Sequence, residues 1–223
     1  MAISFNTSFW LAETTGGAGT TTDSVSGPGS LTDGVVLALL EGDTTSDLIT
    51  AVTYGGVSMS LLVKDKGSSD RWGYIFGLLA PSTGTQDLVC TRSGTTYIGR
   101  QVAFYEGVKQ SGLPDAFNAN SRAGTGTLDT SVTTVADNCW LVGYGKSASG
   151  NPSAGTATTQ RESASGFGVY DSNGAKTPAG SYALQISVNT AGGLLVVSLA
   201  PETGGGGLSI PIVHYHRQQQ RKG

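Results

Sequence analysis

Charged side chains are scarce in this chain. Lys and Arg together number 13, and Asp and Glu 16, so that 13% of the 223 residues are charged, where soluble domains usually carry about 25%. The net charge is only −3, which argues against a basic face for phosphates, and we expect no nucleic-acid partner. Because a monomer generally needs more surface charge to stay soluble, the composition predicts a surface that neighbouring subunits cover.

Histidine is almost absent. The only two histidines, His214 and His216, lie near the end of the sequence. Residues 1–213 therefore contain no imidazole for a Ser-His-Asp or Cys-His mechanism, and they lack the usual ligands of a zinc hydrolase. The sequence predicts that the protein is not an enzyme and has no cofactor.

Two short segments could suggest other chemistry. "GYGKS" (143–147) resembles the end of a phosphate-binding loop, but Trp140 stands where that motif needs its first glycine. The carboxylates of "EGDTTSD", which are Glu41, Asp43 and Asp47, have the composition of a turn and lack the spacing of a calcium loop. Carboxylates paired across folded strands are not visible in a sequence, so a glycosidase stays an open alternative.

Long apolar runs and cysteine clusters are also missing. The longest apolar run, Val35 to Leu40, is too short to span a membrane, and we expect no membrane partner. The first residues, "MAISFNTSFWLAETTGG", show neither a basic leader nor an apolar core, so we expect synthesis in the cytoplasm. Cys90 and Cys139 lie inside apolar segments, which predicts buried free thiols.

An alternation of apolar and polar residues is the strongest pattern present. In "YALQISV", Tyr182, Leu184, Ile186 and Val188 alternate with smaller or polar residues, which is typical of a half-buried strand. "GVVLALL" and "GLLVVSLA" indicate strands buried on both faces, and "TYGGVS" places Gly55-Gly56 at a two-residue hairpin turn. The pattern predicts an all-β protein, an antiparallel β-sandwich of the jelly-roll type. No internal repeat is visible in the sequence. The expected strands cover residues 3–11, 34–41, 48–54, 57–63, 71–79, 86–92, 97–105, 127–134, 138–145, 155–162, 166–171, 181–189 and 193–200.

Two segments depart from the strand pattern. Residues 12–34 are poor in apolar side chains and are expected to form a flexible loop or arm. The alternation also stops near Glu202. We therefore expect one sandwich domain over 1–202 and a flexible tail over 203–223.

The tail is expected to bind a partner. Gly204–Gly207 forms a hinge, and "LSIPIVHYH" has the composition of an edge strand, since Pro211 cannot donate to a central ladder. Such a strand could add to an open sheet edge of another subunit. The alternatives are a metal site at His214 and His216, or a tail without a partner. The candidate partner-binding residues are Leu208, Ile210, Ile212, Val213, Tyr215, Arg217, Arg221 and Lys222.

Aromatic side chains offer a second kind of site. Trp72 follows "SSDR" at the start of an expected strand, and with Tyr74 it is a candidate platform for stacking a sugar ring. Trp140 lies within an apolar strand and is expected in the core. A glycan-binding role would depend on exposure of the Trp72 and Tyr74 rings.

Residues 30–200 contain a series of motifs in a distinctive order. The motifs are a V-x-Y-G-G hairpin, an aromatic strand, a P-x-x-G-T turn and a strand ending in G-V-x-Q. Their residues are Val52, Tyr54, Gly55, Gly56, Trp72, Tyr74, Pro81, Gly84, Thr85, Gly107, Val108 and Gln110. In this order the motifs resemble a β-sandwich module of phage virion proteins and environmental bacterial proteins. These are turn and core positions, so the resemblance implies a fold and no catalytic residues.

The resemblance and the composition together predict a virion structural protein. The expected role is a capsid decoration or cement protein that stabilises a phage head through contacts between subunits and an exchanged tail. Its expected partners are the major capsid protein and other virion subunits, with a homotrimer as the oligomer and the virion as the final location. The alternative is a carbohydrate-binding module or an adhesion protein associated with the tail or fibre.

Overall fold

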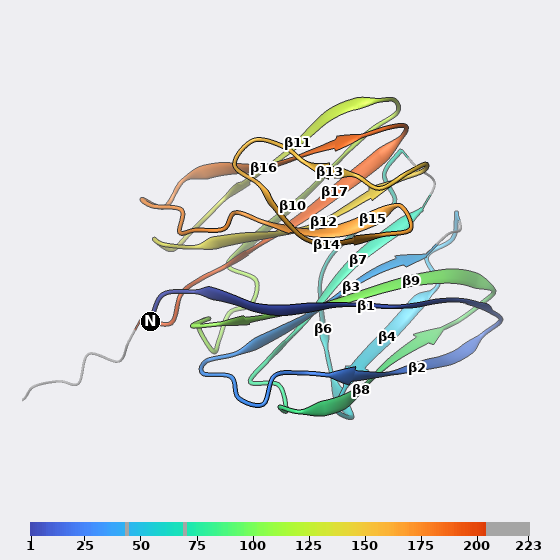
Figure 1. Cartoon of the computed structure of the whole chain (residues 1–223), viewed down its shortest axis with the longest axis horizontal. Helices are drawn as coiled ribbons and strands as arrows, with labels where there is room; N and C mark the ends of the chain where they lie inside the picture. The colour runs from blue at the N-terminus through green and yellow to red at the C-terminus, as the bar shows by residue number, and fades with distance from the viewer. Residues whose placement is uncertain (43–44, 69–70, 204–223) are drawn as a thin grey trace, which may run out of the picture.

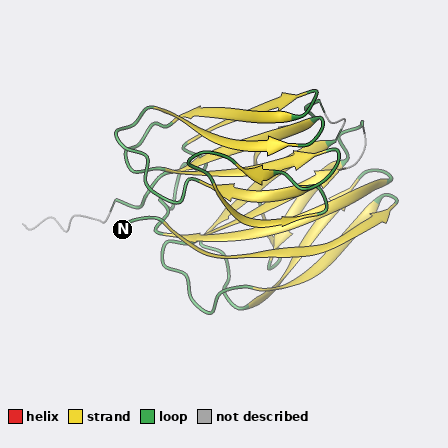
Figure 2. Ribbon diagram, turned by 45° about the horizontal axis from the view of Figure 1, so that its top comes forward, coloured by secondary structure: helices red, strands yellow, loops and turns green. Residues whose placement is uncertain are grey.

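The protein is a stack of four antiparallel β-sheets. The computed structural model describes residues 1–42, 45–68 and 71–203, and this part of the chain forms seventeen strands and no helix (Figures 1 and 2). The all-β, antiparallel class is confirmed. The strands are β1 (Ser4–Gly16), β2 (Gly19–Ser26), β3 (Val35–Gly42), β4 (Ile49–Tyr54), β5 (Val57–Ser58), β6 (Ser60–Asp65), β7 (Trp72–Leu79), β8 (Thr85–Arg92), β9 (Thr96–Glu106), β10 (Ala116–Arg122), β11 (Gly126–Thr133), β12 (Trp140–Ser147), β13 (Ser153–Ala154), β14 (Thr159–Ala164), β15 (Phe167–Asp171), β16 (Ser181–Val188) and β17 (Gly192–Leu199).

The four sheets form two sandwiches. The first sandwich pairs an outer sheet, β2-β8-β4-β5, with an inner sheet, β1-β9-β3-β7-β6. The second pairs an inner sheet, β10-β17-β12-β15-β14, with an outer sheet, β11-β16-β13. The two inner sheets face each other in the middle of the stack (Figure 1). The prediction of a single sandwich over 1–202 is therefore revised to two sandwiches. The jelly-roll order stays a prediction. The interleaved strand orders of each sandwich are compatible with it.

Three apolar cores hold the layers together. One lies inside the first sandwich and contains Tyr54 and Phe104, and one lies inside the second and contains Leu141 and Ile186. The third, here called the shared core, lies between the inner sheets and contains Leu37 among its residues. Inner-sheet strands therefore contact a core on each face, which is why every residue of β3, β12 and β17 is buried.

Outer-sheet strands show the simple alternation that the sequence predicts. In β16, Leu184, Ile186 and Val188 are buried, and the residues between them are less so. The hairpin at Gly55-Gly56 is also confirmed, with φ of 56° and 78° between the paired residues Tyr54 and Val57. Two successive positive φ values suit a type I′ turn, which a side chain at either position would strain.

The two sandwiches repeat one strand order. The two inner sheets correspond strand by strand, in the orders β1-β9-β3-β7-β6 and β10-β17-β12-β15-β14. The outer sheets correspond in the same way, in the orders β2-β8-β4 and β11-β16-β13. The expectation of no internal repeat is therefore wrong at the level of topology. β5, the short partner of β4, has no counterpart among the described strands.

The repeat extends to individual positions and to the packing of the halves. Val35 pairs with Tyr105 at the end of the first inner sheet, and Trp140 pairs with Leu199 at the matching place in the second. All four residues belong to the shared core. At the edges, β1 packs on β14 and its counterpart β10 packs on β6. Each sandwich therefore uses the same surface to contact the other, as the two subunits of an isologous dimer with a twofold axis do.

Residues 12–34 are not one flexible loop, contrary to the expectation. β1 continues to Gly16, and Gly19–Ser26 forms β2, which pairs with β8 along its whole length. β2 is an edge strand whose composition is dominated by Thr and Ser, and it buries only Val25 completely. A strand with so few apolar residues has little hydrophobic periodicity, although Thr favours the strand conformation.

The expected strands also omitted β10. This edge strand, "AFNANSR", is joined to β11 by hydrogen bonds from its side chains. The side-chain amides of Asn118 and Asn120 donate to the carbonyls of Ser131 and Asp129 on β11, at 2.8 and 2.7 Å respectively. These bonds join the open edges of two sheets, where asparagine would ordinarily indicate a turn. Among the described residues, no helix is long and apolar enough to cross a membrane.

Candidate functional site

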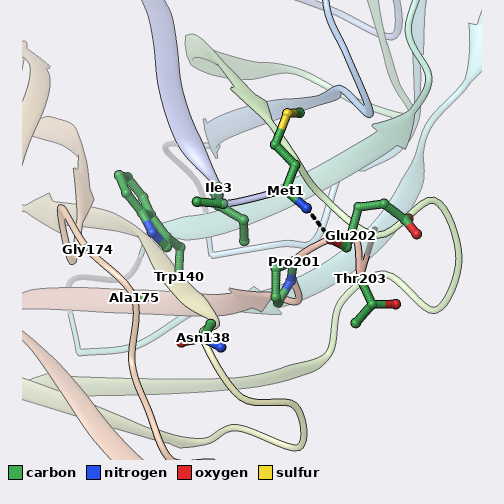
Figure 3. A pocket seen from close by; sticks show the side chains of 10 residues that line it. Met1, Ile3, Asn138, Trp140, Gly174, Ala175, Pro201, Glu202 and Thr203 are labelled. Carbon is green, nitrogen blue, oxygen red and sulfur yellow. Dashed lines mark hydrogen bonds between the residues drawn. The ribbon is translucent and has the colours of Figure 1, made fainter. Parts of the chain in front are cut away.

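A pocket of about 480 Å³ opens at one end of the stack, where the two sandwiches meet (Figure 3). It lies beside the start of β1, the start of β12 and the end of β17. The loop after β15 closes another side. Its volume falls in the range of about 300–1,000 Å³ that is usual for ligand pockets. The lining residues are Met1, Ala2, Ile3, Asn138, Trp140, Gly174, Ala175, Pro201, Glu202 and Thr203.

The floor of this end pocket is apolar. Trp140 is 9% exposed and Ile3 is 5% exposed, and both belong to the shared core. The indole of Trp140 packs edge-to-face on Tyr105 with ring centroids 6.2 Å apart, which holds it in place. The expectation that Trp140 is a core residue is confirmed, although its exposed edge lines a pocket.

Backbone hydrogen bonds fix the rim of the pocket. The amino group of Met1 donates to the carbonyl of Glu202 at 2.6 Å (Figure 3), and the amide of Glu202 donates to the carbonyl of Gly107 at 2.7 Å. A carboxylate oxygen of Glu202 accepts from the amide of Gln110 at 3.2 Å. The body of the protein therefore holds the chain up to Glu202, and the exposed Thr203 leads out from the rim.

The chemistry of the pocket suits binding. Glu202 and the amino group of Met1 are its ionisable groups, and both are engaged in the rim contacts. Within residues 1–42, 45–68 and 71–203, no group of three or more His, Cys, Asp or Glu side chains could hold a metal ion. An apolar floor with a polar rim is suited to an aliphatic or proline side chain from a peptide segment.

The predicted partner-binding residues from Leu208 to Lys222 lie outside the described residues, and so do His214 and His216, the alternative metal site. Their predicted roles stay predictions. What the structure adds is the position from which they start, since Thr203 belongs to the lining of the end pocket.

The predicted glycan platform is wrong in one of its two residues. Tyr74 is 1% exposed, and its hydroxyl donates to Asp47 at 2.8 Å, because β7 lies in an inner sheet. Trp72 is half-buried and stacks on Tyr74 with centroids 6.2 Å apart. Its indole N–H donates to the carbonyl of Thr45 at 3.2 Å, and the ammonium of Lys64 lies 5.7 Å from the ring centroid. Trp72 thus has protein partners where a sugar would need a free face.

The acidic segment near Glu41 differs from the turn that was expected. Glu41 is a fully buried residue of β3 and forms an ion pair of 2.7 Å with Arg71. Asp47 accepts from Tyr74 with one oxygen and pairs with Lys64 through the other. Asp43 lies outside the described residues. These carboxylates connect the loops at one end of the inner sheets, which is a structural role.

The two cysteines are free and buried, as predicted. Burial raises the pKa of the Cys90 thiol to about 12 and that of the Cys139 thiol to about 11. Only the thiolate reacts readily. We therefore expect that a thiol reagent such as dithionitrobenzoate labels neither cysteine of the folded protein at about pH 8 and both after denaturation. Rapid labelling of a native thiol would contradict this packing.

No family model, curated protein or solved structure matches the chain. The resemblance to the phage β-sandwich module thus stays an expectation, and the function has to be inferred from the contacts described above.

Proposed function

We propose that the protein is a structural component of a phage virion, a capsid decoration or cement protein that stabilises the head by joining subunits. Its partners are the major capsid protein and two further copies of itself in a homotrimer. The chain is synthesised in the host cytoplasm and ends in the virion. Residues 204–223 supply the link between subunits.

The observation that carries this proposal is the contrast between the body and the segment that follows it. The body is fixed by three apolar cores, and Glu202 makes the last backbone hydrogen bonds among the described residues. Four glycines then precede the apolar sequence "LSIPIV". A rigid block followed by a glycine hinge and a strand-forming sequence is suited to donating that sequence to a neighbour.

The faces of the outer sheets support the same role. The exposed positions of β2 include Thr20, Thr22 and Ser24, and those of β11 include Thr127 and Ser131. Short uncharged side chains lose little conformational entropy when a neighbour covers them, whereas Lys and Glu lose much more. Covering these faces is therefore inexpensive in free energy.

Deletion of residues 204–223 tests the proposal. We expect the shortened protein to keep a cooperative melt with a β-type far-UV spectrum, because the described bonds of the body end at Glu202. It should lose its binding to capsid shells that lack the protein. A matched control replaces residues 208–216 by an equally long Gly-Ser sequence, which separates the effect of sequence from that of length.

Two outcomes would contradict the proposal. In one, the shortened protein assembles and binds shells as well as the full chain. In the other, the full chain is a monomer absent from purified particles, with saturable binding to a glycan. The second outcome would favour the carbohydrate-binding alternative.

A further inference from the structure

The repeated topology puts two comparable segments at the same end of the stack. Each follows the last strand of its sandwich. The segment after β9 is residues 107–115, which connects the two sandwiches, and the segment after β17 begins at Ala200 and leads into the tail. The two meet where Val108 and Pro201 form an isolated bridge.

The connecting segment shows what such a segment does in the first sandwich. A second pocket of about 240 Å³ lies beside Asp33, and Gln110 of the connecting segment lines it. The side-chain amide of Gln110 donates to the carbonyls of Gly34 and Val108 at 3.2 and 2.7 Å. Three residues further on, Leu113 packs against the shared core and lines a different pocket, together with Gly77 and Leu79. The connecting segment thus folds over this end and anchors itself with an apolar side chain.

The end pocket is the counterpart of that second pocket. Asn138 of the end pocket and Asp33 of the second both have positive φ, 60° and 48°, and each stands two residues before an inner strand. The loops after β15 and β7 complete the two sites through Ala175 and Pro81 respectively. The end pocket has about twice the volume of its counterpart, and the described chain stops at its rim.

The tail carries apolar residues of the same kind, although at a greater distance from the last strand. Leu113-Pro114 in the connecting segment corresponds in kind to Ile210-Pro211 in the tail, an aliphatic residue before proline. Four glycines separate Thr203 from Leu208 and span about 14 Å when extended. Leu208 and Ile210 can therefore reach a pocket that Thr203 itself lines.

We propose that Leu208 and Ile210 occupy the end pocket of their own chain in the free protein, against Trp140 and Ile3. A short glycine tether gives an effective concentration on the order of millimolar, so a second chain at micromolar concentration does not compete. The tail is thereby held back until an assembly partner displaces it. The contact itself stands on the geometry, and only this regulatory consequence rests on the proposed function.

A pair of cysteines tests this contact in the full-length protein. Ala175 is an exposed lining residue of the end pocket, so Ala175→Cys with Ile210→Cys should form a disulfide within one chain under mild oxidation at micromolar concentration. Mass spectrometry of the peptides and a non-reducing gel identify it. The matched control is Thr22→Cys with Ile210→Cys, since Thr22 is exposed on the outer sheet of the first sandwich and should not cross-link.

A second measurement needs no added cysteine. Ile210→Asp should release the tail and raise the rate of chymotrypsin cleavage after Tyr215 by about tenfold, because cleavage follows the population of the open form. Disulfides between chains, no disulfide, or an unchanged cleavage rate would each overturn the inference. If the inference fails while deletion of 204–223 still abolishes shell binding, the proposed function stands without it.

Discussion

Replacing Gly99 with alanine is expected to destabilise the folded protein by about 3 kcal/mol, the upper part of the range for overpacked cores. Gly99 lies on β9, where a side chain would point toward the second sandwich. A Cβ atom at this position would overlap the ring of Phe167 on β15. That ring is fully buried between Trp10 and Tyr144, with centroids 5.0 and 5.7 Å away. It has no room to move, so the added methyl group would force the inner sheets apart. Urea unfolding at neutral pH measures the loss.

Two further variants show whether the loss comes from this contact. Gly29→Ala adds the same methyl group where no atom lies within 4 Å, and it should change the unfolding free energy little. In Gly99→Ala combined with Phe167→Leu, the smaller side chain should recover about 1–2 kcal/mol relative to the sum of the single changes. If Gly99→Ala unfolds like the wild type, the two inner sheets do not pack as described.

The sequence predicted strands well because each strand's alternation and each turn are local. β16 and the Gly55-Gly56 hairpin are examples. The number of sheet layers was harder to predict, since it depends on which sheet faces pack against each other. The signal was nevertheless present in the continuous apolar runs "GVVLALL" and "GLLVVSLA", because a two-layer sandwich buries only one face of each sheet. Strands that are apolar on both faces thus indicated more than two layers.

The internal repeat could not be read from residue identities. The counterparts Val35 and Trp140 differ in size, as do Leu39 and Tyr144, although all four lie in the shared core. Packing requires apolar side chains that together fill the available volume, and many combinations satisfy it. Topology and register are retained where identities are not, so only the paired strands showed the repeat.

The end pocket was beyond prediction for a different reason. Ile3, Trp140 and Pro201 are far apart in the sequence, and only the packing of two sandwiches brings them together. Trp140 was correctly expected in the core, yet its exposed edge depends on the small residues of the loop after β15. Tyr74 was misjudged because an alternating strand normally has one solvent face, whereas β7 has none over Gly73–Gly77.

Lys146 is the least expected residue of the core. It is the lysine of "GYGKS" and is fully buried on β12. Its ammonium donates to the carbonyls of Asp65 and Lys66 at 3.1 and 2.7 Å and to the carbonyl of Arg71. The side chain thus holds the chain between β6 and β7 of the first sandwich from a strand of the second. Burial lowers its pKa to about 8, although the nearby charge of Glu41 acts in the opposite direction.

Lys146→Met is expected to destabilise the protein by about 2 kcal/mol at neutral pH, because three carbonyls lose a charged donor. The difference from the wild type should grow above about pH 8. Between that pKa and the value of 10.5 for an unperturbed lysine, the unfolded chain binds a proton that the folded protein does not, so Lys146 adds stability as the pH rises. The rise is about 1.4 kcal/mol per pH unit, or about 2 kcal/mol by about pH 9.5.

Tyrosines and cysteines with raised pKa values destabilise both proteins alike in this range, so their effects cancel in the difference between the two unfolding free energies. Urea unfolding from about pH 7 to 9.5 measures it, with Lys64→Met as control, since that side chain is 41% exposed. Parallel pH profiles for wild type and Lys146→Met would show that the ammonium is not held in a dry site.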